Sequence, residues 1–181
     1  MKEKVILLVL VGILFTTVSY AQKVTQSVNG AIIDASAIPH TTVKKAISTD
    51  GTNNTMGSNT AANIGSSDSD AKVYVKFEVY KSDNSTGSNW LAAVNLCKNL
   101  TVGSGDWRLP TRRELMLMWV LKPELEKIGD FVSFSTTPEP YWSATEYSPD
   151  DSWYVTFANG KTYHDKKTYS YYRGVRCVRD L

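Results

Sequence analysis

The pair Cys97 and Cys177 constrains the fold of this 181-residue chain more than any other sequence feature. A bond between the two sulfurs would close a loop of about 80 residues, which the chain-entropy model values at roughly 4 to 5 kcal/mol. That gain is comparable to the whole net stability of a small domain, about 5 to 15 kcal/mol. An even cysteine count favours a disulfide in an oxidising compartment, and two free thiols are the alternative.

Residues 1–21 indicate that the chain is exported. Lysines precede an apolar run from Val5 to about Phe15, and small residues at Ser19 and Ala21 suit cleavage before Gln22. The run is shorter than the roughly 20 residues of a membrane span, so a cleaved signal peptide is favoured over an uncleaved anchor. No other segment is apolar enough to span a bilayer. We therefore expect an exported protein at the cell surface, outside the cell or in the periplasm.

The remaining chain divides into two parts, residues 22–71 and residues 72–181. From Ser48 to Asp70 the sequence is nearly all Ser, Thr, Asn, Gly and Asp, which cannot bury enough apolar surface to offset its ordering entropy. Residues 22–47 have no firm period and contain one short candidate strand. We expect residues 22–71 to form a stalk and linker, with 22–47 available for self-association or appendage assembly, and residues 72–181 to form one folded domain.

The folded part is expected to begin with a strand and a helix. Residues 71–80 alternate apolar and polar side chains, which is typical of a strand buried on one face. Ser88 can cap a helix that runs to about Leu100 and turns Cys97 into the core. The buried face of the strand would carry Val73, Val75, Phe77 and Val79.

A second helix and several strands follow. Thr111 and Glu114 form a T-x-x-E capping box, and Pro123 stops or kinks the helix that they begin. The strand candidates are residues 141–147, a hairpin over 152–164 with a primed turn at Asn159-Gly160, and residues 173–179. This order predicts the α+β class, with two helices packed on a small antiparallel sheet.

Five motifs in this order resemble the bacterial Lcl C-terminal domain family and the related major paralogous domain families. The motifs are Trp90 with Cys97, WRLPTRREL (107–115), YWS (141–143), WYVTFANG (153–160) and VRCVR (175–179). The resemblance covers about residues 72–181 and implies a C-type-lectin-like fold in which a disulfide joins the first helix to the last strand, here Cys97–Cys177. We expect a scaffold role for the motif residues because each residue type has a structural job there, and a catalytic role for the arginine-rich stretch is the alternative. The scaffold residues are Trp107, Arg108, Leu109, Pro110, Thr111, Glu114, Trp142 and Trp153.

The sequence offers little support for catalysis or a resident cofactor. No nucleophile context surrounds any serine, and no His/Cys cluster has zinc-ligand spacing. Glu146, Asp150 and Asp151 could collect a calcium ion through oxygen ligands, and a solvated acidic loop is the alternative. A net charge of +2 without a concentrated basic face argues against nucleic acid. We expect no enzyme, no metal and no cofactor.

The region from 146 to 173 has the composition of a binding surface, because tyrosines alternate with short polar residues. Our candidate ligand-binding residues are Glu146, Tyr147, Asp150, Asp151, Tyr163, His164, Lys166, Tyr169, Tyr171 and Tyr172. The basic end of the chain could meet sulfated glycans, a ligand class that the resemblance implies; its cations are Lys161, Lys166, Lys167, Arg173, Arg176 and Arg179.

These observations predict an exported, non-catalytic recognition module that binds a glycan or protein ligand at the cell surface. The alternative is a structural subunit or tip component of a surface appendage, a fimbria-like adhesin. A relative of the formylglycine-generating enzymes, which resemble this fold, is a remote third hypothesis, because those enzymes use a reactive pair of cysteines.

Overall fold

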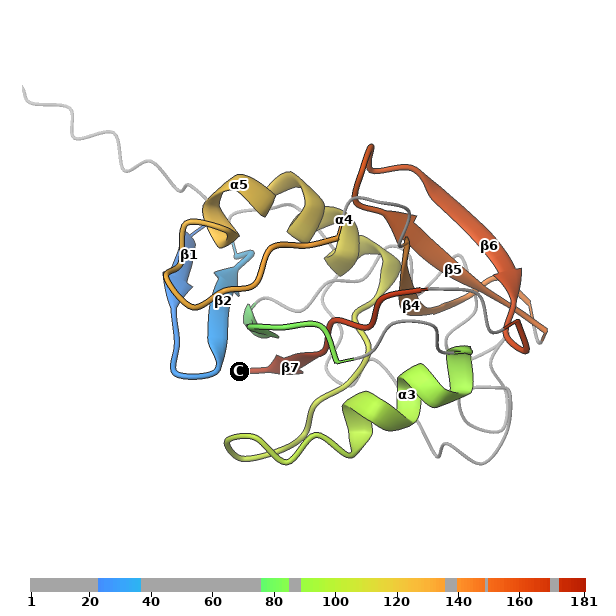
Figure 1. Cartoon of the computed structure of the whole chain (residues 1–181), viewed down its shortest axis with the longest axis horizontal. Coiled ribbons are helices and arrows are strands. Elements are labelled where there is room, and N and C mark those ends of the chain that lie inside the picture. The colour runs from blue at the N-terminus through green and yellow to red at the C-terminus, as the bar shows by residue number, and fades with distance from the viewer. Residues whose placement is uncertain (1–22, 37–75, 85–88, 136–139, 149, 170–172) are drawn as a thin grey trace, which may run out of the picture.

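The computed structural model describes residues 23–36, 76–84, 89–135, 140–148, 150–169 and 173–181 (Figure 1). This part of the chain is an α+β structure, as the sequence predicts, but its strands form two antiparallel sheets rather than one. The elements are β1 (Lys23–Gln26), β2 (Gly30–Asp34), β3 (Lys76–Tyr80), α3 (Trp90–Lys98), α4 (Arg112–Val120), α5 (Lys122–Leu125), β4 (Pro140–Glu146), β5 (Asp151–Thr156), β6 (Thr162–Lys166) and β7 (Val178–Asp180).

The first sheet has the strand order β1-β2-β3-β7, with every neighbour antiparallel. Phe77 and Val79 of β3 are buried, as the alternating pattern predicts. Glu78, on the opposite face, is buried as well, because its carboxylate pairs with the guanidinium of Arg179 on β7. The predicted strand residues 71–75 lie outside the described residues.

Residues 23–36 belong to this sheet, and their assignment to a stalk is wrong. β2 pairs with β3 of the same chain, and Ala31 and Ile33 are fully buried against it. The fully buried apolar side chains of this segment are Ala31, Ile33 and Ala35, too few to give a firm hydrophobic period in the sequence. The short candidate strand itself is confirmed. The predicted signal segment 1–21 and the linker residues 37–71 lie outside the described residues.

The second sheet has the order β4-β5-β6 and contains an irregularity in β4 between Trp142 and Glu146. The β5–β6 hairpin is confirmed, but its two-residue primed turn is not. Only Gly160 of the turn has a positive φ, of 71°. The loop is longer: the backbone N–H of Thr156 donates to the carbonyl of Lys161 (2.9 Å), and Gly160 N–H donates back to Thr156 O (2.8 Å).

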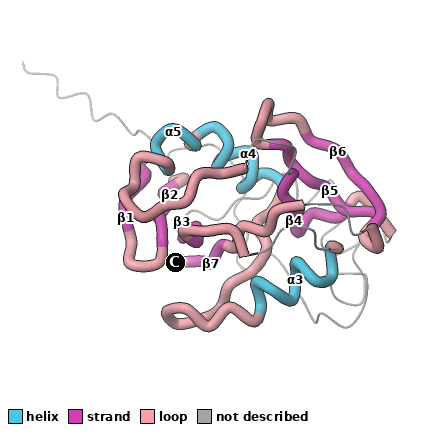
Figure 2. The backbone as a smooth tube through the Cα atoms, viewed as in Figure 1, coloured by secondary structure: helices cyan, strands magenta, loops and turns pink. Residues whose placement is uncertain are grey.

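The last segment connects the two sheets instead of forming one long strand. β7 covers only Val178–Asp180, whereas Gly174 bridges to Tyr141 of β4. The strand expected over 173–179 is therefore correct only at its end. After α5 the described chain continues as a loop to residue 135 (Figure 2). In this loop Val132 N–H donates to the carbonyl of Lys81, directly after β3 (2.8 Å).

The helices begin at side-chain caps. The side chain of Asn89, rather than the expected Ser88, accepts from the backbone of Ala92 at the start of α3; Ser88 lies outside the described residues. The Thr111–Glu114 capping box of α4 is confirmed, and α5 carries Pro123 in its first turn. In Figure 1, α4 and α5 lie on the opposite side from α3.

Two apolar clusters fill the space between these layers. One lies where α4 and α5 meet both sheets, and it includes Leu115, Met118, Phe134, Tyr141 and Val155. The other surrounds the cysteines beneath α3, and it includes Trp90, Cys97, Trp107, Leu109, Trp142, Val175 and Cys177. The second cluster joins residues far apart in sequence, so it fixes how α3, β4 and the C-terminal segment sit together.

Candidate functional site

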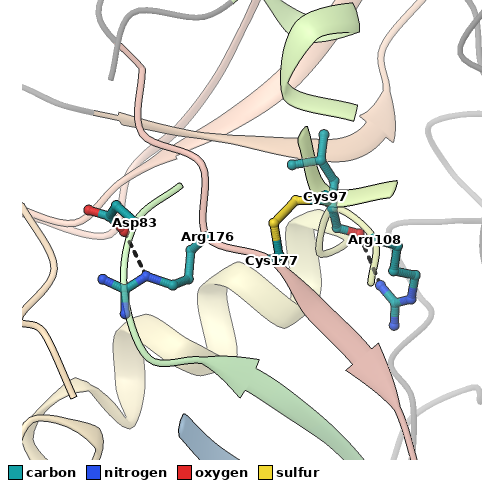
Figure 3. The surroundings of a disulfide bond; sticks show 6 residues. Asp83, Cys97, Arg108, Arg176 and Cys177 are labelled. Atoms are coloured by element: carbon teal, nitrogen blue, oxygen red, sulfur yellow. Dashed lines mark hydrogen bonds and ion pairs between the residues drawn. A yellow bond between two sulfur atoms is a disulfide. The ribbon is translucent and has the colours of Figure 1, made fainter. Parts of the chain in front are cut away.

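Cys97 and Cys177 form the disulfide that the resemblance implied, with 5.4 Å between their Cα atoms. Both residues are fully buried, and Figure 3 shows an arginine on either side of the bond, Arg176 toward Asp83 and Arg108 on the far side. Arg176 Nε lies 2.6 Å from Asp83 Oδ1. The surroundings of the bond are therefore a core of aromatic rings crossed by ion pairs.

The WRLPTRREL stretch builds the scaffold. Arg108 donates from Nη1 and Nη2 to both oxygens of the fully buried Glu114 at 2.8 Å, and from Nη1 to the Leu109 carbonyl at 3.0 Å. It also reaches Asp180 Oδ1 at 2.7 Å. Burial would lower the pKa of Arg108, but the charges of Glu114 and Asp180 outweigh it and raise that pKa above its ordinary value. Trp107 and Leu109 are buried in the cluster around the disulfide, Pro110 and Thr111 are buried beside it, and Trp142 packs in the same cluster.

Glu146, a candidate ligand-binding residue, is not at the surface, and this assignment is wrong. Its carboxylate accepts a hydrogen bond from Lys167 Nζ at 2.8 Å, and the two side chains are 1% and 0% exposed. The ammonium also lies 4.8 Å from the ring centroid of Trp90. Burial lowers the pKa of Lys167, while the Glu146 carboxylate opposes that shift. The pair locks the end of β4 to the chain after β6 and is closed to a ligand.

The basic end of the chain does not form a basic surface. Arg173 and Arg176 are buried and pair with Asp165 and Asp83, and Arg179 pairs with Glu78. Together with the buried Lys167, four of the six cations in the predicted anion-binding group are neutralised by carboxylates. Lys161 and Lys166 are the two exposed cations of that group.

An aromatic cluster lies on the face of the second sheet that α4 approaches; we define it as Tyr147, Trp153 and His164. Trp153 and His164 are opposite each other on β5 and β6. The His164 ring stacks on Tyr147 with 3.7 Å between centroids and 10° between planes, and both rings meet Trp153 edge-on at about 5.4 and 5.3 Å. Tyr147 is 47% exposed, and the His164 side chain is 41% exposed.

Polar groups surround this cluster. The guanidinium of Arg112, at the start of α4, lies 4.0 Å from the ring centroid of Trp153. Burial, with the neighbouring charge of Arg113, lowers the pKa of Arg112 to about 10. Asp151 Oδ2 lies 3.6 Å from His164 Nδ1. The buried indole N–H of Trp153 has no acceptor among the described residues.

Tyr163 lies on the opposite face of the same sheet, because neighbouring residues of a strand point to opposite sides. Its ring is 5.8 Å from that of Tyr154. The Arg173 guanidinium lies 4.2 Å from the rings of both Tyr154 and Trp142, and it donates to Asp165 Oδ2 at 2.6 Å. The candidate residues therefore divide between two faces that cannot contact one small ligand together.

The other candidates are dispersed. Asp150 is exposed in the β4–β5 turn, Lys166 is exposed at the end of β6, and Tyr169 is 40% exposed with Lys166 Nζ 5.9 Å from its ring. Tyr171 and Tyr172 lie outside the described residues. Trp153, which the motifs assigned to the scaffold, belongs to the aromatic cluster. Arg112 was missed, and the only signal for it was its position directly after the Thr111 cap.

The described residues contain no group of three or more His, Cys, Asp or Glu side chains that could hold a metal ion. The Glu146–Lys167 pair removes one carboxylate from the proposed calcium set. Nor does any helix in the described ranges combine the length and apolar content that a membrane crossing requires.

A family model described as the Lcl C-terminal domain matches residues 78–179. Comparison with curated proteins gives no match. The family match begins inside β3 and ends inside β7, so it includes both cysteines and the aromatic cluster and excludes β1 and β2. Because it covers more than half of the 181 residues, the chain belongs to the bacterial Lcl C-terminal domain family.

Proposed function

We propose that this protein is an exported, non-catalytic recognition module of C-type-lectin-like fold, and that it binds a glycan or protein ligand at the bacterial surface through the aromatic cluster. Three features support export and this role together: the signal-like first 21 residues, the disulfide, and a family match spanning the disulfide and the cluster. Folds of this kind host unrelated ligands, so the argument for binding rests on the cluster itself.

The observation that carries the proposal is that two stacked rings, Tyr147 and His164, remain nearly half exposed although they contact each other at 3.7 Å. Fixing an exposed side chain costs conformational entropy, and the burial of Tyr147 and His164 is too small to offset that cost. A tyrosine that is already fixed gives contact area to a ligand at little further entropy cost. An ordered, exposed aromatic cluster is therefore better suited to binding than to stabilising the fold.

The chain around the cluster keeps it in place. Trp153 is held between its strand neighbours and the Arg112 guanidinium, and the buried Glu146–Lys167 pair fixes the residues beside Tyr147. The N–H of Trp153, which finds no acceptor in the part of the chain that the structure describes, is consistent with a site that forgoes some stability, because such a donor costs about 1 to 3 kcal/mol.

The geometry narrows the ligand chemistry. The inner faces of Tyr147 and His164 cover each other, so a saccharide ring or a protein side chain could stack only on an outer face. The charges nearby are mixed, with Arg112 and Asp151 both beside the cluster. Recognition of densely anionic glycans loses support, because most of the cations that would drive it are buried in ion pairs.

The test uses a matched pair of variants, Tyr147→Ala and Tyr163→Ala. The two tyrosines are 47% and 45% exposed, but their rings pack on opposite faces of the second sheet, Tyr147 on His164 and Tyr163 beside Tyr154. The exported chain is screened on a glycan array and a panel of extracellular matrix proteins, and each variant is then measured against every ligand found. We expect Tyr147→Ala to weaken binding by about tenfold or more, as for an aromatic anchor residue, and Tyr163→Ala to leave it nearly unchanged. Equal effects, or no ligand at all, would contradict the proposal.

The pairing of the N-terminal strands weakens the alternative that the protein is a structural subunit of an appendage. It relied on residues 22–47 as a free docking segment, and residues 23–36 are paired within the first sheet. The enzyme alternative would need reactive thiols, whereas Cys97 and Cys177 are bonded to each other.

A further inference from the structure

β6 is an edge strand, and its open side can be read from the hairpin hydrogen bonds. Among the strands that the structure describes, the order β4-β5-β6 leaves β6 with a neighbour on one side. Thr156 N–H donates to Lys161 O, and Lys167 N–H donates to Asp150 O, so Lys161 and Lys167 direct their backbone groups toward β5. Backbone direction alternates along an antiparallel strand. The groups of Thr162, His164 and Lys166 therefore point away from the sheet.

The open stretch is short and closed at one end. The outward N–H of Lys166 donates to Asp165 Oδ1 at 2.8 Å, and Asp165 also binds Arg173. Thr162 and His164 make no backbone hydrogen bond outside the β5–β6 ladder to any described residue. Two donors and two acceptors are thus available between the turn and the capped end, enough to pair a short extended segment.

The charges beside the open stretch indicate which charged side chains such a segment would carry. Lys161 and Lys166 flank the open stretch, both are exposed, and neither forms an ion pair within the described ranges. They stand at the two ends of a strand of five residues, about 17 Å at the usual rise. A peptide with a carboxylate near each end and uncharged residues between would match both the hydrogen-bonding edge and the two cations.

We infer that the β6 edge takes an extended acidic peptide segment of a partner protein by strand addition, in which main-chain hydrogen bonds supply affinity and alternate side chains supply specificity. The inference rests on the proposed recognition function and names its partner as protein rather than glycan. Those side chains of the added strand that point to the α4 side of the sheet would contact the aromatic cluster, which links the edge to the proposed recognition site.

The probe is a fluorescein-labelled eight-residue peptide of alternating threonine and valine with glutamate at both ends, compared with the same peptide ending in lysines. Binding to the exported chain is followed by fluorescence anisotropy. We expect the acidic peptide to bind about tenfold or more tightly than the basic one, a difference that shrinks as salt is raised. Equal binding of the two peptides, or none, overturns the inference.

A variant pair isolates the backbone contribution. Thr162→Pro removes an outward N–H without breaking the β5–β6 ladder, whereas Thr162→Val keeps it and changes the side chain by a similar amount. We expect Thr162→Pro to weaken the acidic peptide about fivefold or more relative to Thr162→Val, the effect of roughly one lost hydrogen bond. Similar affinities for the two variants would mean that side chains, not the edge, hold the peptide.

Amide exchange gives a readout that does not depend on how the proline variant folds. In the free protein the amides of Tyr163 and Asp165 should be protected and those of Thr162 and His164 should exchange fast; the peptide should protect the latter two. Unchanged exchange at Thr162 and His164 under saturating peptide refutes strand addition. If a Tyr147-dependent ligand is found while this test fails, the recognition function stands and the edge inference alone falls.

Discussion

Removing the disulfide should cost most of the stability of the fold. The bond joins residues separated by 80 positions. Applying the chain-entropy relation to a loop of that length gives about 4.5 kcal/mol at 25 °C. In the double variant Cys97→Ala/Cys177→Ala, two fully buried sulfurs also leave the apolar cluster beneath α3, and each loss adds about 1 kcal/mol. We expect a total loss of about 6 to 7 kcal/mol, against a typical net stability of about 5 to 15 kcal/mol.

The assay is guanidinium unfolding of the exported chain followed by tryptophan fluorescence. Trp90, Trp107 and Trp142 all pack in the cluster around the bond, so their emission reports on it directly. Reduced wild-type protein is the matched control, because it keeps both sulfur atoms and loses only the cross-link. The reduced protein should lose about 4 to 5 kcal/mol and the alanine variant somewhat more.

The result that would refute this reasoning is a loss below about 2 kcal/mol in both proteins. That outcome would mean that the unfolded chain is already restricted without the bond, so that closing the loop changes its entropy little. A small loss on reduction with a large loss in the alanine variant would instead assign the effect to buried packing. The two measurements together therefore separate covalent constraint from core contacts.

Three further predictions concern single residues. Arg108→Met leaves the buried Glu114 carboxylate without its guanidinium and should lower the free energy of unfolding in urea by about 3 to 5 kcal/mol. Adding Glu114→Gln to this variant should restore part of the lost free energy; additive effects of the two substitutions would contradict the coupling between Arg108 and Glu114. Burial, and then the charge of a neighbouring carboxylate, raises the pKa of Tyr141. The stability that the neutral phenol contributes is therefore present below about pH 10, the pKa of an unfolded tyrosine, and is lost as the pH rises further. In Tyr141→Phe the urea unfolding midpoint should fall less steeply between about pH 8 and about pH 11 than in the wild-type protein. Gly160→Ala should lower stability by about 1 to 3 kcal/mol, because φ is +71° and the new Cβ would lie 2.7 Å from an indole ring; an unchanged melting temperature would contradict this.

The sequence predicted the elements whose signals are local. The capping box at Thr111 and Glu114 needs only residues three apart, and the alternation at Phe77 and Val79 needs one strand. β1 and β2 were misassigned because their burial depends on β3, which follows about 40 residues later in the chain. Ala31 and Ile33 lie in a segment of modest apolar content without a firm period, and only the register with β3 makes them core residues.

The candidate site was predicted as a region but not as a set of residues. Tyrosine-rich composition pointed to the stretch that holds Tyr147 and His164, which is where the exposed rings lie. The number of cations near the C-terminus led to the wrong prediction of a basic surface. The partners of Arg176 and Arg179 are Asp83 and Glu78, which lie 93 and 101 residues away in the sequence. A run of cations in sequence became a set of buried ion pairs.

Tyr163 and His164 show what a sequence alone could not resolve at this site. They are adjacent and similarly exposed, and composition treats them alike. The β5 register puts His164 opposite Trp153 and Tyr163 opposite Tyr154, so one ring joins the cluster beside α4 and the other lies over Arg173. Which of the two faces lies beside α4 is set by residues that the strand does not contain. A one-residue shift of β6 would exchange the two rings, so the register of this hairpin, rather than its composition, determines which side chains a ligand can meet.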